Sequence, residues 1–572
     1  MRDLYKSKAF VWTLLILFLL VWFYMLGART LVPSDEGRYA EMAREMVATQ
    51  DWITTRLNGI KYFEKPPLQT WMNAVTFELF GLGEWQARLW TGLCGLLGIG
   101  LAAYTGTRVM NGRVGFYAAL VLGSSFFWAG MAHINTLDMG LAGMMTITLC
   151  ALLLGQRNDA SRESQRNWML VCWAGMALAV LSKGLIGIVL PGAVLVLYTL
   201  LARDWGIWKR LHLVKGLILF FVITTPWFVA VSLKNPEFPE FFFIHEHFQR
   251  FTSKIHSRPG PWYYFIPILL LGIVPWLGVF FQGLWQGVRD QRDSGGYHSI
   301  NGGRFQPGKL LLVWSAFIFV FFSVSGSKLP SYILPIFPAL ALLIASYLER
   351  ADHKALAWAG SLVAVPSAVA LAFIPRVPEM AKNDFARPLV EAHVPYLYAA
   401  ALIFFVGGVA AIRLARQHKD AAVTALAATA FIAGQLLMLG HDPQGRYSAG
   451  VDHLPALQAE LKPETPLYVV GRYEQSLPFY LQRTMIMVQH ADELSFGLKQ
   501  EPQLWLPTVD AFVAQWVADH AAGKKDIAII DPAVYQQLQQ RQLPMRLIGQ
   551  DPRRVIVAND PPTTGTRGRV TP

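Results

Sequence analysis

Acidic and basic side chains that could bind a phosphate group or stabilise a developing charge stand beside the apolar segments of this 572-residue chain. Asp35 and Glu36 directly follow the first apolar run, and Arg38 and Tyr39 come about one helical turn later. Acids at the start of a helix are ordinary partners of the helix dipole, which is a sufficient reason for Glu36. Asp35 lies where a membrane helix would reach the surface, so a capping role and a chemical role both stay open for it.

Glu64 and Lys65 form a second charged pair, within the string KYFEKPPLQTW at 61–71. The two prolines that follow them favour an extended and stiff backbone. A lysine ammonium is a compact partner for phosphate, and a glutamate can bind a metal ion or a sugar. The alternative is a charge pair at the membrane interface with no chemical role.

A stretch rich in histidine and arginine at 241–264 contains His245, His247 and Arg250. The H-x-H spacing is weak support for a metal site, because two residues apart on a helix are turned by about 200°. His245 could instead share a metal ion with Glu64 from another loop, whereas a polar interfacial loop without metal is the plainer interpretation. Arg250 is a candidate ligand for an anion.

Four further polar residues lie at the edges of apolar runs. Ionisable groups in such places are costly unless they are paired or functional. The tyrosine among the four could equally belong to the aromatic residues that gather at membrane interfaces. The four are Asp138 in HINTLDMG, Lys183 in LSKGLIG, and Lys328 and Tyr332 in SGSKLPSYILPIFP.

Thirteen apolar runs are predicted to be the membrane helices that position these residues. Hydrophobic residues make up 53% of the chain and charged residues only 15%, against about 25% charged residues in globular proteins. This composition excludes a disordered, collagen-like or disulfide-rich secreted chain, and most runs have the length of a bilayer crossing. The runs fall near 9–28, 85–107, 114–131, 139–155, 168–182, 184–202, 213–233, 262–285, 310–325, 332–348, 355–375, 394–412 and 421–440.

The loops between the runs indicate the orientation of the chain. With residue 1 in the cytoplasm, the short loops on that side are rich in Arg and Lys, as the positive-inside rule requires. Topology therefore explains much of the net charge of +12, and nucleic acid is not an expected partner. The long loops 29–84 and 234–261 then lie outside with the C-terminus, which predicts a site at the outer membrane surface.

Two domains are predicted, a membrane domain at 1–440 that carries the external loops and an external α/β domain at 441–572. Within the first external loop, residues 34–49 have the pattern of an amphipathic helix that begins at Ser34 and lies along the membrane interface. In the C-terminal domain, strands are predicted near 467–471, 484–488, 526–530 and 545–549, and helices near 474–482, 508–520 and 532–541.

The strings SDEGRYAEMAREM, YFEKPPLQTWM, LDMG, LSKGLIG and KLPSYILPIFP together resemble the GT-C class of polyprenyl-phosphate-dependent glycosyltransferases. Within that class they resemble most the bacterial 4-amino-4-deoxy-L-arabinose lipid A transferases, over most of the membrane region. The resemblance implies a polytopic helical protein of the bacterial inner membrane, with interfacial helices, active site and C-terminal α/β domain on the periplasmic side. It also implies an inverting pentosyltransferase with an undecaprenyl-phosphate-linked donor and a lipid A acceptor, which confers resistance to polymyxin and other cationic antimicrobial peptides.

The resemblance assigns roles to the polar residues. Asp35, Glu64 and Asp138 are expected to act in catalysis. Asp35 would orient the acceptor or the sugar ammonium, or stabilise positive charge at the anomeric carbon, and only with a hydroxyl acceptor would it have to take a proton. Cations around the site would stabilise the departing lipid phosphate. The expected substrate-binding residues are Arg38, Tyr39, Tyr62, Lys65, Lys183, Arg250, Lys328 and Tyr332.

A divalent metal ion at Glu64 and His245 is a possible cofactor by this interpretation, and no nucleotide is expected. Two other functions stay open. The first is a GT-C mannosyltransferase-like enzyme that transfers a sugar from polyprenyl phosphate to a hydroxyl group. The second is a lipid transporter or flippase, which would have broken helices and an ion site at the middle of the membrane, whereas the charged residues here gather near the outer surface.

Overall fold

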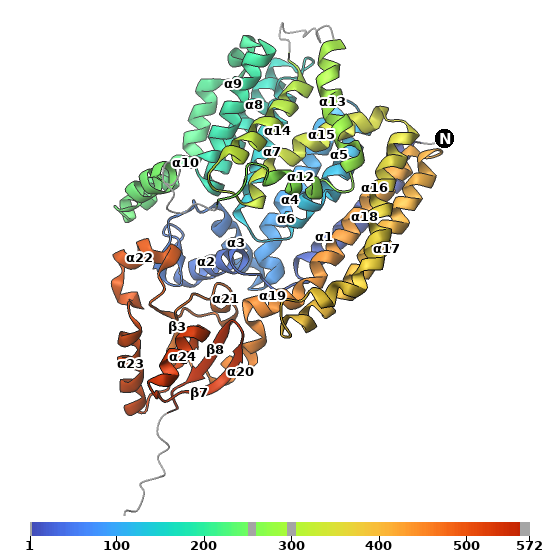
Figure 1. Cartoon of the computed structure of the whole chain (residues 1–572). Coiled ribbons are helices and arrows are strands. Elements are labelled where there is room, and N and C mark those ends of the chain that lie inside the picture. Colours follow the sequence, from blue (N-terminus) through green and yellow to red (C-terminus); the bar gives the residue numbers. More distant parts are fainter. Residues whose placement is uncertain (1–2, 250–258, 294–304, 561–572) are drawn as a thin grey trace, which may run out of the picture. The chain divides into compact units, whose positions relative to one another are not determined.

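The computed structural model of the protein describes residues 3–249, 259–293 and 305–560. It consists mainly of helices, with one six-stranded sheet in the C-terminal part of the chain (Figure 1). The chain forms two compact units, and each unit is built from two separate segments of the sequence. The fold class predicted from the sequence, a polytopic helical protein with a C-terminal α/β domain, is confirmed.

Unit 1 comprises Met1–Arg29 and Glu64–Pro443, and unit 2 comprises Thr30–Phe63 and Gln444–Pro572. The units differ from the predicted domains in one respect. The first part of the external loop, expected to belong to the membrane domain, is in the same unit as the C-terminal sheet.

The helices of unit 1 follow the apolar runs of the sequence, because a helix satisfies its own backbone groups and can therefore lie in a lipid environment. Short helices with 3-10 geometry, and one π-helical segment, connect several of them. The α-helices are α1 (Lys8–Leu26), α3 (Leu68–Phe80), α4 (Glu84–Val109), α5 (Gly112–Ser124), α6 (Phe126–Ala132), α7 (Leu137–Gly155), α8 (Arg162–Lys183), α9 (Ile186–Ala202), α10 (Leu213–Lys234), α12 (Phe265–Gly272), α13 (Leu277–Asp293), α14 (Pro307–Val324), α15 (Phe337–Arg350), α16 (His353–Phe373), α17 (Ala386–Ala415) and α18 (Lys419–Gly440). The connecting segments are η1 (Leu4–Lys6), η2 (Trp205–Arg210), η3 (Glu240–Gln249), η4 (Pro330–Ile336) and η5 (Ile374–Met380).

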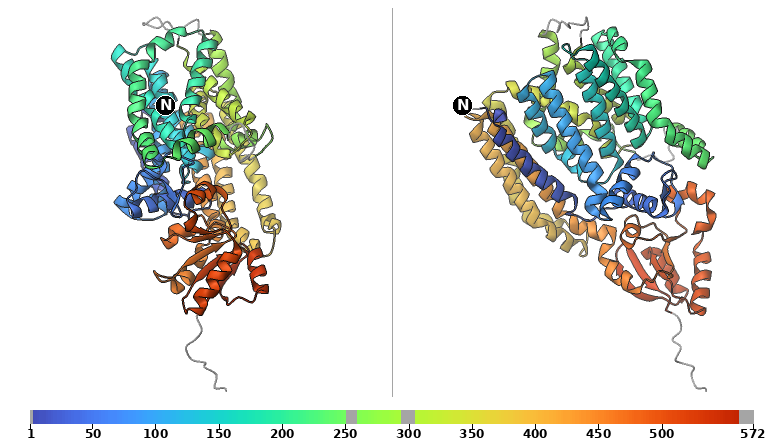
Figure 2. Two further views of the ribbon diagram at one scale, coloured as in Figure 1. Left: turned by 90° about the vertical axis from the view of Figure 1, so that its left-hand side faces the viewer. Right: turned by 180° about the vertical axis from the view of Figure 1, so that it is seen from behind.

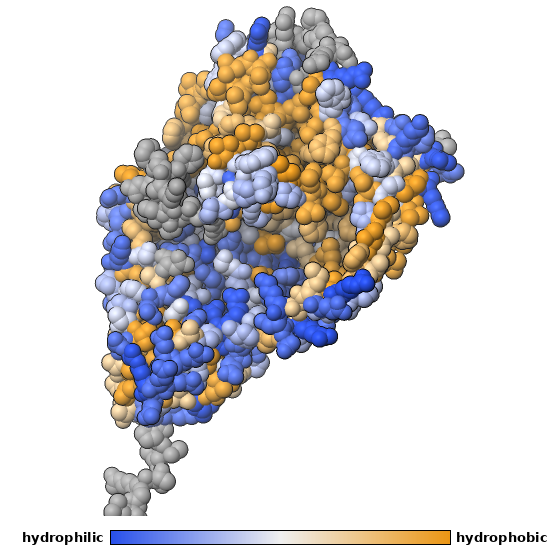
Figure 3. All heavy atoms as spheres, viewed as in Figure 1, coloured by the Kyte–Doolittle hydropathy of each residue, from blue (hydrophilic) through white to orange (hydrophobic). Residues whose placement is uncertain are grey.

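The outer surface of unit 1 is apolar. Leu20 of α1 and Ile218 and Phe221 of α10 are each more than half exposed, and hydrophobic residues cover much of the face of unit 1 that Figure 3 shows. Apolar surface of this extent is unfavourable in water and compatible with lipid chains. The outer surface therefore supports a multi-pass membrane protein.

Each of the thirteen predicted runs coincides with a helix or with a pair of helices. In the described residues, nine helices are long and apolar enough to cross a membrane, and up to eleven if each of two bent pairs is counted as one span. The other two predicted runs correspond to α8 and to the shorter apolar helix α9. The positions of the runs are thus confirmed, and the number of crossings stays a prediction.

The two bent pairs support each other at their breaks. α5 and α6 meet at an angle of 66°, and α12 and α13 meet at 106°. A break leaves backbone groups without their helical partners, which is tolerated inside a membrane protein only where other protein groups satisfy them. Here the backbone N–H of Phe126, at the start of α6, donates to the carbonyl of Val274 between α12 and α13, at 3.2 Å.

Helices α16, α17 and α18 run side by side (Figures 1 and 2). Small residues let two of them approach closely. A Cβ atom added at Gly360 of α16 would lie 2.8 Å from the carbonyl oxygen of Gly408 of α17, and one added at Gly408 would lie 2.7 Å from that of Gly360. Such close packing of glycines is a common way for helices to associate in membranes.

Unit 2 combines a helix and a hairpin from the first external loop with the C-terminal α/β fold. The elements from the loop are α2 (Asp35–Thr49), β1 (Arg56–Leu57) and β2 (Ile60–Lys61). The C-terminal α-helices, beginning with one at the boundary between the units, are α19 (Asp442–Ala449), α20 (Leu454–Glu460), α21 (Leu477–Leu481), α22 (Ser495–Gln500), α23 (Val509–Ala521) and α24 (Pro532–Gln540), with η6 (Val451–His453), η7 (Asp492–Leu494) and η8 (Pro502–Leu504) between them. The strands are β3 (Leu467–Val470), β4 (Ile486–Val488), β5 (Trp505–Leu506), β6 (Ile527–Ile530), β7 (Arg546–Asp551) and β8 (Arg554–Ala558).

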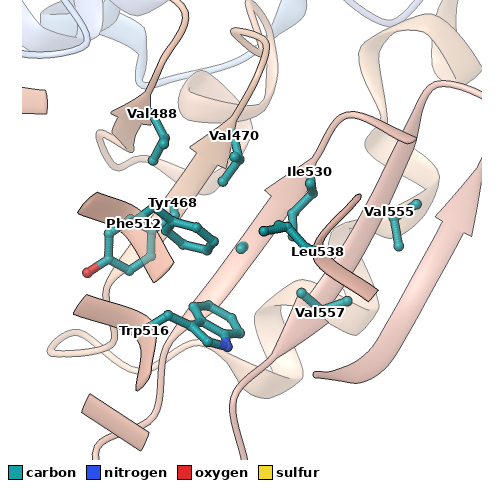
Figure 4. Close-up of a cluster of buried hydrophobic side chains, with 10 residues drawn as sticks. Tyr468, Val470, Val488, Phe512, Trp516, Ile530, Leu538, Val555 and Val557 are labelled. Carbon is teal, nitrogen blue, oxygen red and sulfur yellow. The ribbon is translucent and has the colours of Figure 1, made fainter. Parts of the chain in front are cut away.

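The sheet of unit 2 has the strand order β5-β4-β3-β6-β8-β7. Strands β3 to β6 are parallel, and β8 pairs antiparallel with both β6 and β7. On one side of the sheet, Val470, Ile530 and Val557 pack with Phe512 and Trp516 of α23 in a closed apolar core (Figure 4). The predicted strands correspond to β3, β4, β6 and β7, and the three predicted helices to α21, α23 and α24. The sequence analysis missed β5 and β8.

Helix α2 confirms the helix predicted at 34–49, and its position at the membrane interface stays a prediction. Every residue from Glu36 to Met46 is buried. Ser34 precedes the helix as expected, although its side chain makes no capping hydrogen bond.

Candidate functional site

The N-terminal turn of α2 carries a small charged cluster in unit 2. Arg38 lies one turn after Asp35, and its Nη1 is 3.6 Å from the Asp35 carboxylate. Its Nη2 is 2.8 Å from the carboxylate of Glu493, which lies in η7 of the C-terminal fold. The side chain of Asp35 is 43% exposed, whereas that of Arg38 is 10% exposed. A buried arginine thus holds two acids, one of which faces outward.

Two predicted tyrosines lie near the same guanidinium. Tyr39 and Tyr62 are both buried and act on Arg38 electrostatically. Burial by itself lowers the pKa of Arg38, but Tyr62, Tyr39, Glu493 and Asp35 together hold it above its ordinary value. Four predicted site residues, Asp35, Arg38, Tyr39 and Tyr62, are therefore brought together in unit 2.

Glu36 has the structural role that the sequence suggested. Its carboxylate is buried and accepts the backbone N–H of Val32 at 2.9 Å, so it closes the turn that leads into α2. The turn is also attached to the C-terminal fold, since Leu31 donates its N–H to the Tyr480 hydroxyl and accepts from the Ser476 hydroxyl. Asp35 and Glu36 are neighbours with different surroundings.

Gly37 lets α2 pack directly against the chain that follows β3. A Cβ atom at this position would lie 2.6 Å from the carbonyl oxygen of Gln475 and 2.7 Å from Cα of Ser476. Real Cβ atoms essentially never approach backbone so closely, so a side chain here would push the helix away. Packing against the α/β fold therefore determines the position of α2 at Gly37 and at the residues next to it.

The hairpin after α2 turns at Asn58 and Gly59, which both have positive φ angles, 57° and 75°. Asn-Gly is the preferred pair for a two-residue hairpin turn, so this dipeptide is a signal that the sequence analysis overlooked. The Asn58 side chain pairs with the backbone of Met485, just before β4, through two hydrogen bonds of 2.7 Å. Arg56 adds an ion pair with Glu501 at 3.0 Å.

The buried side chain of Glu45 connects α2 to this hairpin. Its two carboxylate oxygens accept the backbone N–H groups of Asn58 at 2.5 Å and Gly59 at 2.7 Å. One turn earlier, Glu41 forms a two-pronged pair with Arg44 at 2.6 and 2.7 Å. Burial, and after it the charge of Glu41, raise the pKa of Glu45 to about 8.

We expect Glu45 to make the stability of the protein pH-dependent. Its pKa in the folded protein lies above the ordinary value of 4.5, so the folded state holds the proton more tightly than the unfolded state. This stabilisation is complete below about pH 4.5 and is lost as the pH rises through about 8. The measurement is the thermal unfolding temperature of wild type and Glu45→Gln in detergent. Between pH 5 and pH 8.5 this temperature should fall less for the variant than for wild type.

Glu460→Gln serves as a matched control for that measurement. The Glu460 carboxylate pairs with Arg546 and Lys525, and these hydrogen bonds lower its pKa to about 2. Glu460 is therefore charged throughout the tested range, and its replacement should leave the pH slope unchanged. An equal slope for wild type and Glu45→Gln would contradict the assignment.

A second cluster lies in unit 1. Asp138, in the first turn of α7, forms a close ion pair with Lys183, the last residue of α8. Both positions suit the helix dipoles, which favour an anion at a helix start and a cation at a helix end. The Lys183 ammonium also lies 4.7 Å from the centre of the Tyr332 ring in η4, a cation–π distance. Three predicted residues from three elements thus come together.

Glu64 and Lys65 are adjacent to each other just before α3. The Lys65 ammonium donates to the Glu64 carbonyl at 2.8 Å and is 3.9 Å from its carboxylate. Their side chains are 18% and 21% exposed. The pair is therefore mostly enclosed, with part of each charged group accessible.

Lys328 is buried and closes the end of α14. Its ammonium donates to the carbonyls of Ser323 at 2.8 Å and Ser325 at 2.6 Å. These are helix C-terminal carbonyls, which lysine commonly caps. Lys328 also borders a largely apolar pocket of about 890 Å³ with Trp262. Its role in substrate binding stays a prediction.

Two predicted residues fall outside what the structure describes. Arg250 belongs to the undescribed residues 250–258, and the side chain of His245 is likewise outside the described part. The metal site proposed for Glu64 and His245 therefore stays a prediction. Within the described residues, no group of three His, Cys, Asp or Glu side chains is placed to hold a metal ion.

Glu493 is the residue that sequence reasoning missed. It lies in HADELSF, a short polar stretch of the C-terminal domain with no motif around it. Its pairing with Arg38 arises from the packing of two segments more than 450 positions apart, so no local pattern could reveal it. Each cluster combines acids with a cation, as recognition of a phosphate and of a cationic sugar would require.

A unit of apolar helices with charged clusters at helix ends, in a chain that also carries an α/β fold, defines a multi-pass membrane protein. Two family models match the chain. Residues 453–559 match the Aminoarabinose transferase C-terminal domain, and residues 64–229 match Dolichyl-phosphate-mannose-protein mannosyltransferase.

Individual proteins give closer matches. The crystal structure of ArnT from Cupriavidus metallidurans bound to undecaprenyl phosphate is similar with a TM-score of 0.90 and 42% identity, over 97% of this chain and 98% of that one. Undecaprenyl phosphate-alpha-4-amino-4-deoxy-L-arabinose arabinosyl transferases from Edwardsiella ictaluri and Aeromonas hydrophila are each 32% identical. These alignments cover 60% and 64% of this chain, and 60% and 65% of the relatives' own length. The chain belongs to the ArnT family of aminoarabinose transferases.

Proposed function

We propose that this protein transfers 4-amino-4-deoxy-L-arabinose from undecaprenyl phosphate to a phosphate group of lipid A. The observation that carries the proposal is the match to ArnT bound to undecaprenyl phosphate, at 42% identity over nearly the whole chain. The site would lie on the periplasmic face of the bacterial inner membrane, with the α/β fold of unit 2 in the periplasm. Because the added sugar carries an ammonium group, the product would bind polymyxin and other cationic peptides less well.

In the proposed reaction, an oxygen of the lipid A phosphate attacks the anomeric carbon of the sugar. The bond from that carbon to the phosphate oxygen of the donor breaks, and its electron pair leaves with undecaprenyl phosphate. Direct displacement inverts the anomeric centre. The attacking oxygen is already largely anionic near neutral pH, so the reaction needs little general-base assistance.

The chain's own residues would bind and polarise the two lipids. Lys65, Lys183 and Arg250 supply cations for the two phosphates and stabilise the charge that develops on the leaving phosphate. Asp35 has an outward-facing carboxylate and would stabilise positive charge on the sugar, at its ammonium or its anomeric carbon. Arg38 would orient the Asp35 carboxylate through their ion pair.

A second candidate is transfer of a sugar from polyprenyl phosphate to a hydroxyl group. The match of residues 64–229 to a mannosyltransferase model favours it. With a hydroxyl acceptor, Asp35 would have to take a proton in the reaction.

Mass spectrometry of lipid A from cells with and without the protein tests the proposal. We expect a phosphate-linked pentosamine that is absent without the protein. The purified protein should also form this product from undecaprenyl-phosphate aminoarabinose and lipid A. Transfer to a hydroxyl group instead would support the second candidate, and no transfer in vitro together with lipid movement across vesicles would support a flippase.

A further inference from the structure

Three buried amide side chains of unit 1 meet at one oxygen atom. Gln69 and Asn73, one turn apart on α3, both donate to Oδ1 of Asn135, at 2.8 and 2.9 Å. Gln69 also donates to Oδ1 of Asn73 at 3.3 Å. Two nitrogen donors on one atom identify that atom as the amide oxygen of Asn135. We call Gln69, Asn73 and Asn135 the amide triad.

The amide triad is completely enclosed by protein. Its three side chains are at most 1% exposed, and Gln69 packs against α7 at Gly140, where an added Cβ would lie 3.2 Å from Gln69 Oε1. A buried amide that loses its partner is left with polar atoms that neither protein nor water satisfies, which is unfavourable. The triad therefore favours one relative arrangement of α3 and the chain before α7.

The two segments that the triad joins carry predicted site residues. Lys65 comes four residues before Gln69, across the stiff Pro66–Pro67 pair. Asp138 comes three residues after Asn135 and holds Lys183 in its ion pair. Apart from chain connectivity, the triad is thus a direct polar link between the segment with Lys65 and the segment with the Asp138–Lys183 pair.

We propose that the amide triad is a positioning device that fixes the separation between Lys65 and the Asp138–Lys183 pair during glycosyl transfer. The three amides touch no substrate and act through the residues next to them. This inference rests on the proposed function, because it assumes that these cations hold the phosphates of donor and acceptor. Alignment of the attacking oxygen, the anomeric carbon and the leaving oxygen depends on such spacing, and a displacement of about 1 Å can lower a rate by about 100-fold.

Steady-state kinetics of purified Asn135→Ala and Asn73→Leu test the proposal. Asn135→Ala removes the shared acceptor, and Asn73→Leu removes one donor while keeping a similar volume. We expect kcat to fall by about 10- to 100-fold in both, with the KM of each lipid changed less than about threefold. Loss of packing that merely unfolded part of the protein would lower the active fraction, which titration with a tight-binding donor analogue would reveal.

Asn135→Asp provides the rescue. A carboxyl oxygen at this position accepts both amide donors in either protonation state, so the variant should recover at least a third of the wild-type kcat. Gln156→Leu is the matched control, because Gln156 is a buried amide at the other end of α7 that accepts from Arg210. It should lower thermal stability in detergent without changing kcat.

The outcomes separate this inference from the proposed function. If wild type transfers no aminoarabinose, the proposed function is wrong. If wild type is active and Asn135→Ala and Asn73→Leu keep its kcat, the function stands and the positioning role is wrong. A fall in kcat that Asn135→Asp does not reverse would also count against the triad.

Discussion

Asp35→Asn should lower the rate of aminoarabinose transfer by about 100- to 1,000-fold and leave the fold intact. The Asp35 side chain is 43% exposed, and substitutions at such positions usually change stability by less than about 0.5 kcal/mol. Asparagine has nearly the same shape but no charge, so it cannot stabilise positive charge on the sugar. The measurement is kcat/KM with purified lipids, beside a thermal unfolding curve in detergent.

Glu36→Gln is the matched control for Asp35→Asn. Glu36 is the next residue, but its carboxylate is buried against the backbone N–H of Val32. Its replacement should lower the unfolding temperature and have the smaller effect on kcat. If Asp35→Asn kept the wild-type rate, or lost activity only in proportion to lost folded protein, the chemical role of Asp35 would be refuted.

Lys183→Gln should both destabilise the protein and stop transfer. Asp138 and Lys183 are largely buried, with side chains 10% and 16% exposed, and removal of one partner leaves the other charge enclosed and uncompensated. The expected loss of stability is about 3 kcal/mol. The cation–π contact with Tyr332 is lost as well. We expect transfer to fall by at least about 100-fold because a cation proposed to bind phosphate is missing.

The double variant Asp138→Asn/Lys183→Gln separates these two effects. A neutral amide pair can hydrogen-bond in place of the ion pair, so most of the lost stability should return. Activity should not return, because neither the cation nor the carboxylate is restored. Recovery of both stability and transfer would show that the pair serves the fold alone.

Part of the candidate site follows from local spacing in the chain. Asp35 and Arg38 are one helical turn apart, so once residues 34–49 are helical their side chains must lie near each other. The same holds for Glu64 and Lys65, which the prolines keep close to the start of α3. Asn58 and Gly59 are also a local signal, because this dipeptide is typical of a two-residue hairpin turn. The turn was not among the predictions.

The partners of these residues depend on packing. Arg38 pairs with Glu493, and Asp138 pairs with Lys183, 45 positions away. Many acids and bases in the chain could form such pairs, and only the assembled helices and strands select which do. Strand β8 was missed for a similar reason. Arg554–Ala558 is short, and it is recognised as a strand only through its pairing with β6 and β7.

By itself, the sequence determined that this is a helical membrane protein with a C-terminal α/β fold, and where each apolar run lies. Those properties depend on the length of apolar runs and on local periodicity. Both can be read from residues that are neighbours in the chain. The tertiary structure decided that residues 30–63 fold with the C-terminal sheet rather than with the helices around them. It did so through contacts such as Gly37 with Ser476 and Asn58 with Met485. Contacts over more than 400 positions depend on three-dimensional fit, because distance along the chain does not limit which folded surfaces meet.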